Sequence, residues 1–169
     1  MKPAVFFDRD GTLNIEKDYL FKKEDFEWIP GAVNAIGWLK QKGFMVFVVT
    51  NQSGIARGYY SVGDMEKLHD FMQQELLQEG FAIDAFYYCP HHPDIDGDCF
   101  CRKPQPGMIL KAMKDHDIDK EKSFLIGDKD RDVKAAENAG IRGYLYQGGD
   151  IFAMVKEIVE KQDKDAENL

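Results

Sequence analysis

The amino-acid sequence predicts an α/β fold in which helices cover both faces of a doubly wound, mainly parallel sheet, with no large cap domain. Short apolar runs alternate with segments of helical period, and the runs are nearly continuous, as in strands buried on both faces. Repeated strand–helix–strand order implies right-handed crossovers and therefore parallel strands. The chain has 169 residues, so we expect one domain, over residues 1–162, and a polar tail at residues 163–169.

Five apolar runs predict the strands of this sheet. Each run is short and rich in Val, Ile, Phe or Tyr, the residues that fit a pleated, buried surface. The runs are Ala4–Phe7, Phe44–Thr50, Ala85–Tyr88, Ser123–Ile126 and Gly143–Tyr146.

The segments between these runs have the signals of helices. Ser61 is a candidate N-cap with Asp64 three residues later, and apolar residues then recur on one face. Pro106 stands where the first turn of another helix begins. We expect a last helix over Asp150–Lys161, with frayed residues from Gln162 onward. Glycines end three of the helices, at Gly43, Gly80 and Gly140.

The charge and the apolar runs exclude several classes of protein. A formal net charge of −8 argues against a nucleic-acid footprint, which is normally basic. The longest apolar run, Phe44–Val49, is far shorter than the ~20 residues of a membrane span, and the N-terminus lacks the pattern of a signal peptide. We therefore expect a cytoplasmic monomer that binds neither nucleic acid nor membrane.

Two stretches interrupt the alternation of strands and helices: Asn14–Pro30 and Cys89–Pro104. Both follow predicted strands, so both emerge at the carboxyl edge of the sheet, where open α/β sheets bind ligands. Loops of this length in a compact domain are usually functional. We therefore expect the site at this edge.

Aspartates follow two of the predicted strands. Asp8 and Asp10 come after the first strand, and Asp128 and Asp132 come after the fourth. Carboxylates at the carboxyl ends of neighbouring strands converge, and they repel one another unless a cation lies between them. Mg²⁺ prefers such oxygen ligands. The pattern therefore predicts a magnesium site.

These carboxylates also suit phosphate-ester hydrolysis. Asp8 comes directly off its strand and is the candidate nucleophile, because a carboxylate that attacks phosphorus splits one difficult step into two. Asp10 is the candidate acid and base, which protonates the leaving oxygen and then takes a proton from water. Asp128 would hold the metal.

Several polar side chains can bind phosphate near this centre. The segment after the second strand offers a hydroxyl and free backbone amides. Lys103 would balance the phosphoryl charge at Asp8, and Arg102 can hold an anion with two parallel hydrogen bonds. The candidate phosphate and substrate contacts are Thr50, Asn51, Gln52, Ser53, Arg57, Arg102, Lys103 and Lys129.

The second long loop has the composition of a zinc site. It contains three cysteines and two histidines, and four such ligands close a tetrahedral structural zinc. Cys-x-His and Cys-x-Cys form matching hooks, which favours His91 over His92 as the fourth ligand. The expected ligands are Cys89, His91, Cys99 and Cys101. Since Cys101 precedes Arg102, this zinc would brace the substrate-binding residues.

The order of these motifs resembles that of the haloacid dehalogenase superfamily of phosphatases: Asp8-x-Asp10-Gly11-Thr12, then Thr50, then Lys103, then Gly127-Asp128-x-x-x-Asp132. The resemblance implies a phospho-aspartate on Asp8, with Asp10 as acid and base. It also implies Mg²⁺ bound by Asp8, the backbone carbonyl of Asp10, and Asp128. Thr50 would bind the phosphoryl group. Asp132 would not bind the metal directly but would support its ligands or act through metal-bound water.

Within the superfamily, the chain resembles the D-glycero-D-manno-heptose 1,7-bisphosphate 7-phosphatases, a histidinol-phosphatase-like group. The segments that carry this likeness are Thr50–Gly58, Cys89–Pro93 and Cys101–Pro104. The likeness implies removal of the 7-phosphate in the synthesis of ADP-heptose for lipopolysaccharide core or a related glycan. It also implies that Glu16, Lys17, Asp18 and Tyr19 lie against the substrate. The link at Asp94–Asp98 is short for this group.

Two other functions fit parts of the pattern. Histidinol-phosphate phosphatase shares the acidic centre and a similar zinc loop. A signalling receiver also carries a phosphorylated aspartate at the edge of a parallel sheet, but it has no need of an acid and base two residues later. The pair Asp8 and Asp10 therefore favours an enzyme that acts on a small phosphorylated metabolite.

Overall fold

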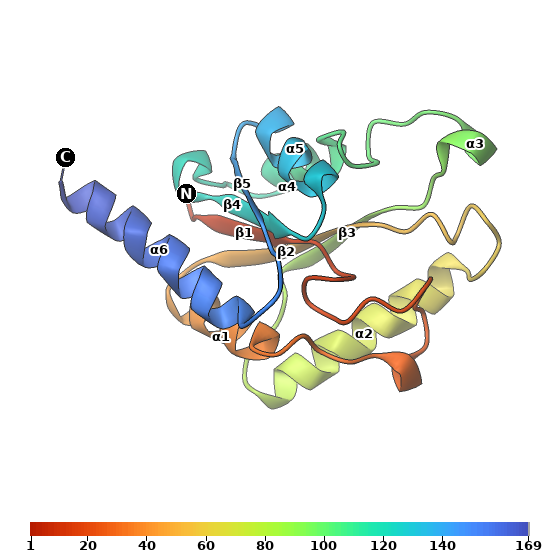
Figure 1. Ribbon diagram of the computed structural model, residues 1–169, viewed down its shortest axis with the longest axis horizontal. Coiled ribbons are helices and arrows are strands. Elements are labelled where there is room, and N and C mark those ends of the chain that lie inside the picture. The colour runs from red at the N-terminus through yellow and green to blue at the C-terminus, as the bar shows by residue number, and fades with distance from the viewer. Residues whose placement is uncertain (169) are drawn as a thin grey trace.

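The computed structural model describes residues 1–168 and contains a five-stranded parallel sheet (Figure 1). The strand order is β3-β2-β1-β4-β5, so β1 lies at the centre, between β2 and β4. The strands are β1 (Ala4–Phe7), β2 (Met45–Asn51), β3 (Ala85–Cys89), β4 (Phe124–Gly127) and β5 (Arg142–Leu145).

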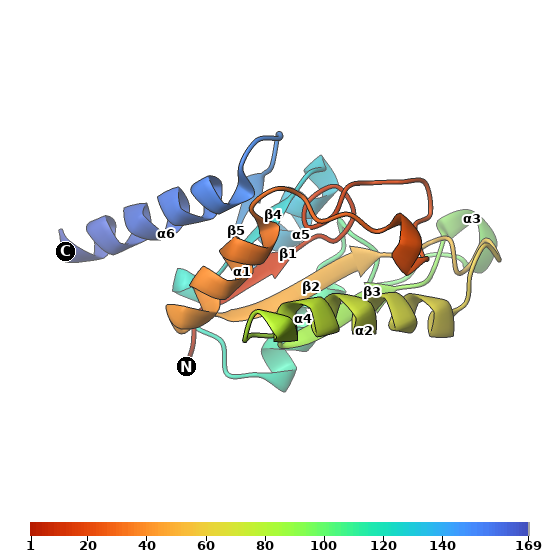
Figure 2. The same cartoon turned by 90° about the horizontal axis from the view of Figure 1, so that it is seen from below.

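Helices cover both faces of the sheet. In Figure 1, α4 and α5 lie above it and α1 and α2 lie below it, while α6 extends toward the C-terminus, and Figure 2 gives the perpendicular view. The helices are α1 (Ala32–Gln41), α2 (Val62–Gln78), α3 (Pro93–Asp96), α4 (Gly107–Asp115), α5 (Asp130–Asn138) and α6 (Ile151–Glu167). The predicted doubly wound α/β fold is therefore confirmed.

The core is divided by the sheet into two buried layers. Val5 and Phe7 of β1 point to the layer that α1, α2 and α6 close, whereas Ala4 and Phe6 point to the layer of α4 and α5. Both sets of side chains are fully buried. Burial on both faces explains why the strands appear in the sequence as continuous apolar runs.

The elements begin and end close to the predicted residues, with one clear exception. Ser61 and Asp64 form the expected capping box at the start of α2. The last helix, expected to end at Lys161, instead continues to Glu167. The short helix α3 within the second long loop was not predicted; it begins after His92, whose ring accepts the N–H of Asp94.

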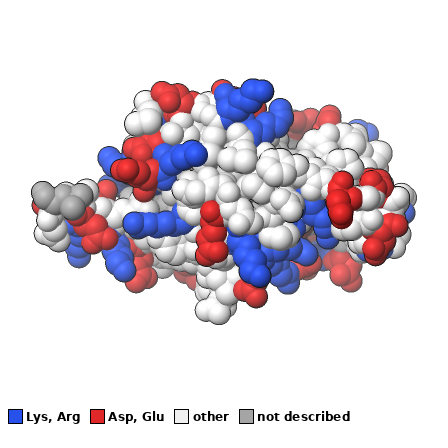
Figure 3. Space-filling model, turned by 90° about the horizontal axis from the view of Figure 1, so that it is seen from above, with Lys and Arg blue, Asp and Glu red and all other residues white. Residues whose placement is uncertain are grey.

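On the face shown in Figure 3, Lys and Arg form groups separated by acidic and uncharged residues. No helix among residues 1–168 is both long and apolar enough to cross a membrane.

Candidate active site

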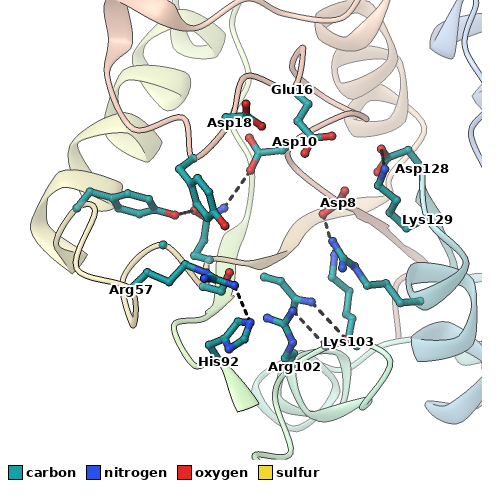
Figure 4. A pocket seen from close by; sticks show the side chains of 17 residues that line it. Asp8, Asp10, Glu16, Asp18, Arg57, His92, Arg102, Lys103, Asp128 and Lys129 are labelled. Carbon is teal, nitrogen blue, oxygen red and sulfur yellow. Dashed lines mark hydrogen bonds and ion pairs between the residues drawn. The ribbon is translucent and has the colours of Figure 1, made fainter. Parts of the chain in front are cut away.

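A pocket of about 290 Å³ opens at the carboxyl edge of the sheet and contains most of the predicted site residues. Figure 4 shows acidic side chains on one side of it and Arg57, His92 and Arg102 on the opposite side. The lining residues lie at or just after the carboxyl ends of β1, β2, β3 and β4: Asp8, Asp10, Glu16, Asp18, Tyr19, Asn51, Gln52, Ser53, Gly54, Arg57, Tyr60, His92, Arg102, Lys103, Asp128, Lys129 and Arg131.

Asp8 lies at the end of β1 in contact with a buried cation. The ammonium of Lys103 is 2.7 Å from Asp8 Oδ1 and 2.6 Å from Asp132 Oδ1. Burial raises the pKa of the Asp8 carboxyl well above its ordinary value, although Lys103 opposes this shift. Burial alone would lower the pKa of Lys103, but the two carboxylates outweigh it and raise that pKa. Lys103 is therefore a fixed cation between two aspartates.

Lys103 is also positioned through its backbone. Its N–H donates to Asn51 Oδ1 at 3.0 Å, and its ammonium donates to the carbonyl of Val49 at 2.9 Å. Both carboxylate oxygens of Asp132 have a partner. Oδ1 contacts the ammonium of Lys103, and Oδ2 accepts the N–H of Lys129 at 3.0 Å. Asp132 therefore holds Lys103 and the start of α5.

The acidic centre fits a divalent cation. Carboxylate oxygens of Asp8, Asp128 and Asp132 lie within 4.8 Å of one another, and Asp128 Oδ1 is buried without a hydrogen-bond partner. Gly11, at φ +87°, approaches so closely that a Cβ there would lie 2.2 Å from Asp128 Oδ2. A cation beside these oxygens would satisfy Asp128 and favour the ionised form of Asp8.

Asp10 is held by side-chain donors from three residues. Arg9 donates through Nε to Oδ1 at 3.1 Å and through Nη2 to Oδ2 at 3.0 Å. Asn14 Nδ2 donates to Oδ1 at 2.9 Å, and Gln52 Nε2 donates to Oδ2 at 3.2 Å. The Asp10 carboxylate is therefore fixed in orientation while remaining at the pocket.

Thr50 and Lys17 do not line the pocket, although the sequence pattern placed both at the substrate. Thr50 is buried, and its Oγ1 accepts from Gln52 Nε2 at 2.8 Å. Lys17 instead pairs with Glu27 at 2.7 Å on the surface. The expected contact of Lys17 with the substrate therefore stays a prediction, and in this structure its ammonium pairs with Glu27 outside the pocket.

Cationic and aromatic side chains form the far side of the pocket. Arg57 Nη2 contacts His92 Nε2 at 2.8 Å and lies over the ring of Tyr19, 5.9 Å from its centre. Arg102 donates to the carbonyl of His91 at 3.4 Å. The loop after β3 therefore orients both arginines, one through His92 and one through His91.

The predicted zinc ligands form one compact cluster. Four contacts join them: Cys89 Sγ to His91 Nδ1 at 3.6 Å, Cys89 Sγ to Cys99 Sγ at 3.5 Å, His91 Nδ1 to Cys101 Sγ at 3.3 Å, and Cys101 Sγ to Cys99 Sγ at 3.5 Å. A tetrahedron with zinc–sulfur bonds of ~2.3 Å has edges of about 3.8 Å. These separations are therefore close to the edges of a zinc-ligand tetrahedron, and they are too long for a disulfide.

His91, rather than His92, completes this cluster. Burial raises the pKa of the Cys89 thiol. Burial acts in the same direction at Cys99, but hydrogen bonds from the Arg102 backbone and neighbouring thiols outweigh it and lower the pKa to about 7. A thiolate, which is the form that binds zinc, is thus accessible near neutral pH.

Four residues at or beside the pocket were not recognised from the sequence. Tyr60 and Arg131 lie in turn and helix segments with no motif, and His92 was considered only as a zinc ligand. Arg9 occupies the variable position between Asp8 and Asp10, and its burial depends on segments far along the chain.

Comparison with known proteins gives concordant matches. The family described as HAD-hydrolase-like matches residues 100–165. The chain is 46% identical over 146 residues to D-glycero-beta-D-manno-heptose-1,7-bisphosphate 7-phosphatase of Pasteurella multocida, covering 84% of this chain and 79% of that protein. It is 42% identical over 170 residues to the enzyme of the same name from Rhodopseudomonas palustris, covering 98% and 94%.

A solved structure agrees with these relatives. The D,D-heptose 1.7-bisphosphate phosphatase of B. bronchiseptica, complexed with magnesium and phosphate, superposes with a TM-score of 0.85 at 32% identity, covering 95% of this chain and 99% of that chain. These relatives favour neither a histidinol-phosphate phosphatase nor a signalling receiver. The chain therefore belongs to the heptose 1,7-bisphosphate 7-phosphatase family of haloacid dehalogenase-like hydrolases.

Proposed function

We propose that this protein removes the 7-phosphate from D-glycero-D-manno-heptose 1,7-bisphosphate through a phospho-aspartate on Asp8. The observation that carries the proposal is the contact of Asp8 with the buried ammonium of Lys103, beside Asp128 and two residues from Asp10. The names of the relatives supply the substrate class.

In the first step, an oxygen of Asp8 attacks phosphorus and the bond from phosphorus to the sugar oxygen breaks. Asp10 donates a proton to that leaving oxygen. Lys103 stays against the reacting carboxylate and neutralises charge on the phosphoryl group. Asp8, Asp128 and the backbone carbonyl of Asp10 would hold Mg²⁺, which supplies further positive charge there.

In the second step, water attacks phosphorus of the phospho-aspartate and Asp10 takes a proton from that water. The bond from phosphorus to Asp8 breaks, which releases inorganic phosphate and restores the Asp8 carboxylate. Because Asp10 serves once as an acid and once as a base, its orientation matters in both steps.

The far side of the pocket suits the second phosphate of a bisphosphate. Arg57 and Arg102 line it opposite the acidic centre, and Lys129 lies at the pocket beside Asp128. These cations give the pocket local positive charge, although the whole protein carries a net charge of −8. Glu16 and Asp18, on the acidic side, can accept hydrogen bonds from sugar hydroxyls.

Zinc would have a structural role in this scheme. Cys89, His91, Cys99 and Cys101 would fill all four positions of a tetrahedral ion, which leaves none for water. Ordering this loop fixes His92 and Arg102, and through His92 it fixes Arg57.

The test is a substrate panel with product analysis. With Mg²⁺, the enzyme should hydrolyse a heptose 1,7-bisphosphate anomer best, and ³¹P NMR should show a retained 1-phosphate. Histidinol phosphate, fructose 1,6-bisphosphate and an aryl phosphate are the comparisons. Loss of the 1-phosphate, or a higher kcat/KM for histidinol phosphate, would overturn the assignment.

Metal removal tests the acidic centre separately. EDTA should abolish turnover, and added Mg²⁺ should restore it, because the Asp8–Asp128 oxygens converge where the phosphoryl group must bind. Full turnover in rigorously metal-free buffer would contradict this part of the proposal.

A further inference from the structure

The largest fully buried side chain among residues 1–168 is a cation, Arg9. Its exposed fraction is 1%, and in the sequence it stands between Asp8 and Asp10. A buried guanidinium is costly unless its hydrogen bonds are satisfied, and such groups rarely improve stability over apolar residues. A role in function is therefore the stronger explanation for Arg9.

Every nitrogen of the Arg9 guanidinium has a partner. Nε and Nη2 hold the Asp10 carboxylate, as described above, and Nη2 also donates to the carbonyl of Leu20 at 3.0 Å. Nη1 contacts His69 Nε2 at 3.2 Å, from a residue 60 positions along the chain. Asp10 is the one carboxylate paired with Arg9 among the described residues.

His69 is built to accept this hydrogen bond. It lies on the buried side of α2, and its ring stacks on Phe86 with centres 4.2 Å apart and planes 14° from parallel. Burial, together with the charge of Arg9, lowers the pKa of His69 to about 3. The ring is thus neutral, with its proton on Nδ1 and its Nε2 free to accept from Arg9.

The amide of Gln52 is oriented in the same way. Tyr60 donates its hydroxyl proton to Gln52 Oε1. This contact directs Gln52 Nε2 toward Asp10 Oδ2 and Thr50 Oγ1. Arg9 and Gln52, which touch Asp10, are therefore each held by a second buried side chain.

We infer that His69, through Arg9, and Tyr60, through Gln52, are positioning residues that set the orientation of the Asp10 carboxylate for proton transfer. The inference rests on the proposed function of Asp10. Its consequence is specific: loss of either support should weaken proton transfer while leaving the attack of Asp8 and substrate binding intact. An aryl phosphate needs no acid when its phenolate leaves, so only its second step should slow.

The test uses 4-nitrophenyl phosphate and the magnesium-loaded enzyme in stopped flow. In His69→Leu, release of nitrophenolate should show a burst of about one equivalent, followed by a slower steady state. Steady-state kcat should fall by about tenfold or more, part of the ~10²–10⁴-fold that acid–base catalysis contributes. KM for the sugar bisphosphate should change little. His69→Gln, whose amide oxygen can accept from Arg9, should recover most of kcat.

Two further variants separate positioning from a loss of stability. Leu76→Ala truncates a fully buried residue of the same helix away from Arg9, so it should lower the melting temperature without producing a burst. Tyr60→Phe removes one hydroxyl, keeps the ring, and should give a burst of its own. If His69→Leu does not fold, Tyr60→Phe alone decides the test.

Asp10→Asn is the reference for the proposed function. If Asp10→Asn gives a burst and both His69→Leu and Tyr60→Phe keep wild-type kcat, or lose it without a burst, the positioning role is wrong. If Asp10→Asn itself retains wild-type kinetics, the proposed function has failed. These two failures are therefore distinguishable.

Discussion

The acidic centre and the Cys–His cluster lie at the same edge of the sheet but are held there in different ways. Asp8 and Asp128 come directly after β1 and β4, whose strands are paired and fully buried. The cluster lies after β3 in a segment whose only regular element is the four-residue helix α3. The acidic centre is thus positioned by the sheet, whereas the Cys–His cluster lies in a segment with little regular structure to hold it.

The two regions therefore depend on different sources of order. Residues at the ends of paired strands are held rigidly by the core, because moving them would break strand pairing. A loop that buries few apolar side chains needs another source of order, and the proposed structural zinc would supply it. The first region should therefore tolerate loss of a side chain without reorganising, and the second should not.

The strongest test of the acidic centre is Asp8→Asn. An amide cannot attack phosphorus, so turnover should fall by more than about 10⁴-fold, the scale seen when a nucleophile is removed. The circular dichroism spectrum and the zinc content should match the wild type, since the strand remains. Retention of a tenth of wild-type turnover would contradict a covalent intermediate on Asp8.

Asp10→Asn should have the next largest effect. Because one carboxylate serves both steps, kcat should fall by about 10²–10⁴-fold on a substrate with a poor leaving group. The melting temperature should also fall, because the buried Arg9 guanidinium loses its carboxylate and the new amide nitrogen faces donors where a carboxylate oxygen accepted. A loss below tenfold at neutral pH would argue against this role.

Cys99→Ser should have a smaller and more selective effect. It removes one of four ligands, so zinc should be released or held weakly, and the segment Cys89–Pro104 should become sensitive to protease. Disorder of Arg102 should lower kcat/KM for the sugar bisphosphate by about tenfold or more, because one charged contact with the substrate is lost. An aryl phosphate should lose less.

Controls make the zinc prediction decisive. The Cys89→Ser, Cys99→Ser, Cys101→Ser triple variant should contain no zinc when measured by mass spectrometry, and stoichiometric metal in it would exclude the site. Equal losses on both substrates, with an unchanged circular dichroism spectrum, would show that the loop has no part in recognition.

The smallest expected effect concerns the free energy of unfolding of the protein at low pH. His69 has a folded-state pKa of about 3, below the ~6.5 of an unfolded histidine. Between these values the unfolded chain binds one more proton, so stability falls as the pH falls. Relative to His69→Gln, the wild type should lose up to about 1.4 kcal/mol per pH unit in this window. Urea unfolding at pH 7, 6 and 5 measures this difference, and parallel curves would show that His69 titrates normally.

The sequence predicted the parts of the molecule that depend on local pattern. The five strands lie within one or two residues of the expected runs, because burial on both faces leaves a continuous apolar signal. The four expected zinc ligands, chosen from the two hooks, do lie together in one cluster that includes His91. The acidic centre followed from aspartates at strand ends, which parallel pairing brings together.

The sequence did not predict features that depend on distant segments or on weak local preferences. Burial of Arg9 requires the carbonyl of Leu20 and the ring of His69, and neither is visible in a motif. Lys17 adjoins the pocket residues in sequence but pairs with Glu27. The last turns of α6 are polar yet helical, since Lys and Glu are good helix formers and Glu160 precedes Lys164 by four residues.

The central place of β1 has a consequence for synthesis on the ribosome. Its first residue donates to Ser123, 119 residues later in the chain. At ~5–20 residues per second, the partner strand β4 emerges roughly 6–24 s after β1. During that interval one edge of β1 is unpaired, and Asp8 lacks Asp128 throughout and Lys103 for most of it. The acidic centre is therefore among the last parts of the nascent chain to be assembled, and a prematurely terminated product that ends before β4 would lack Asp128 and should be inactive.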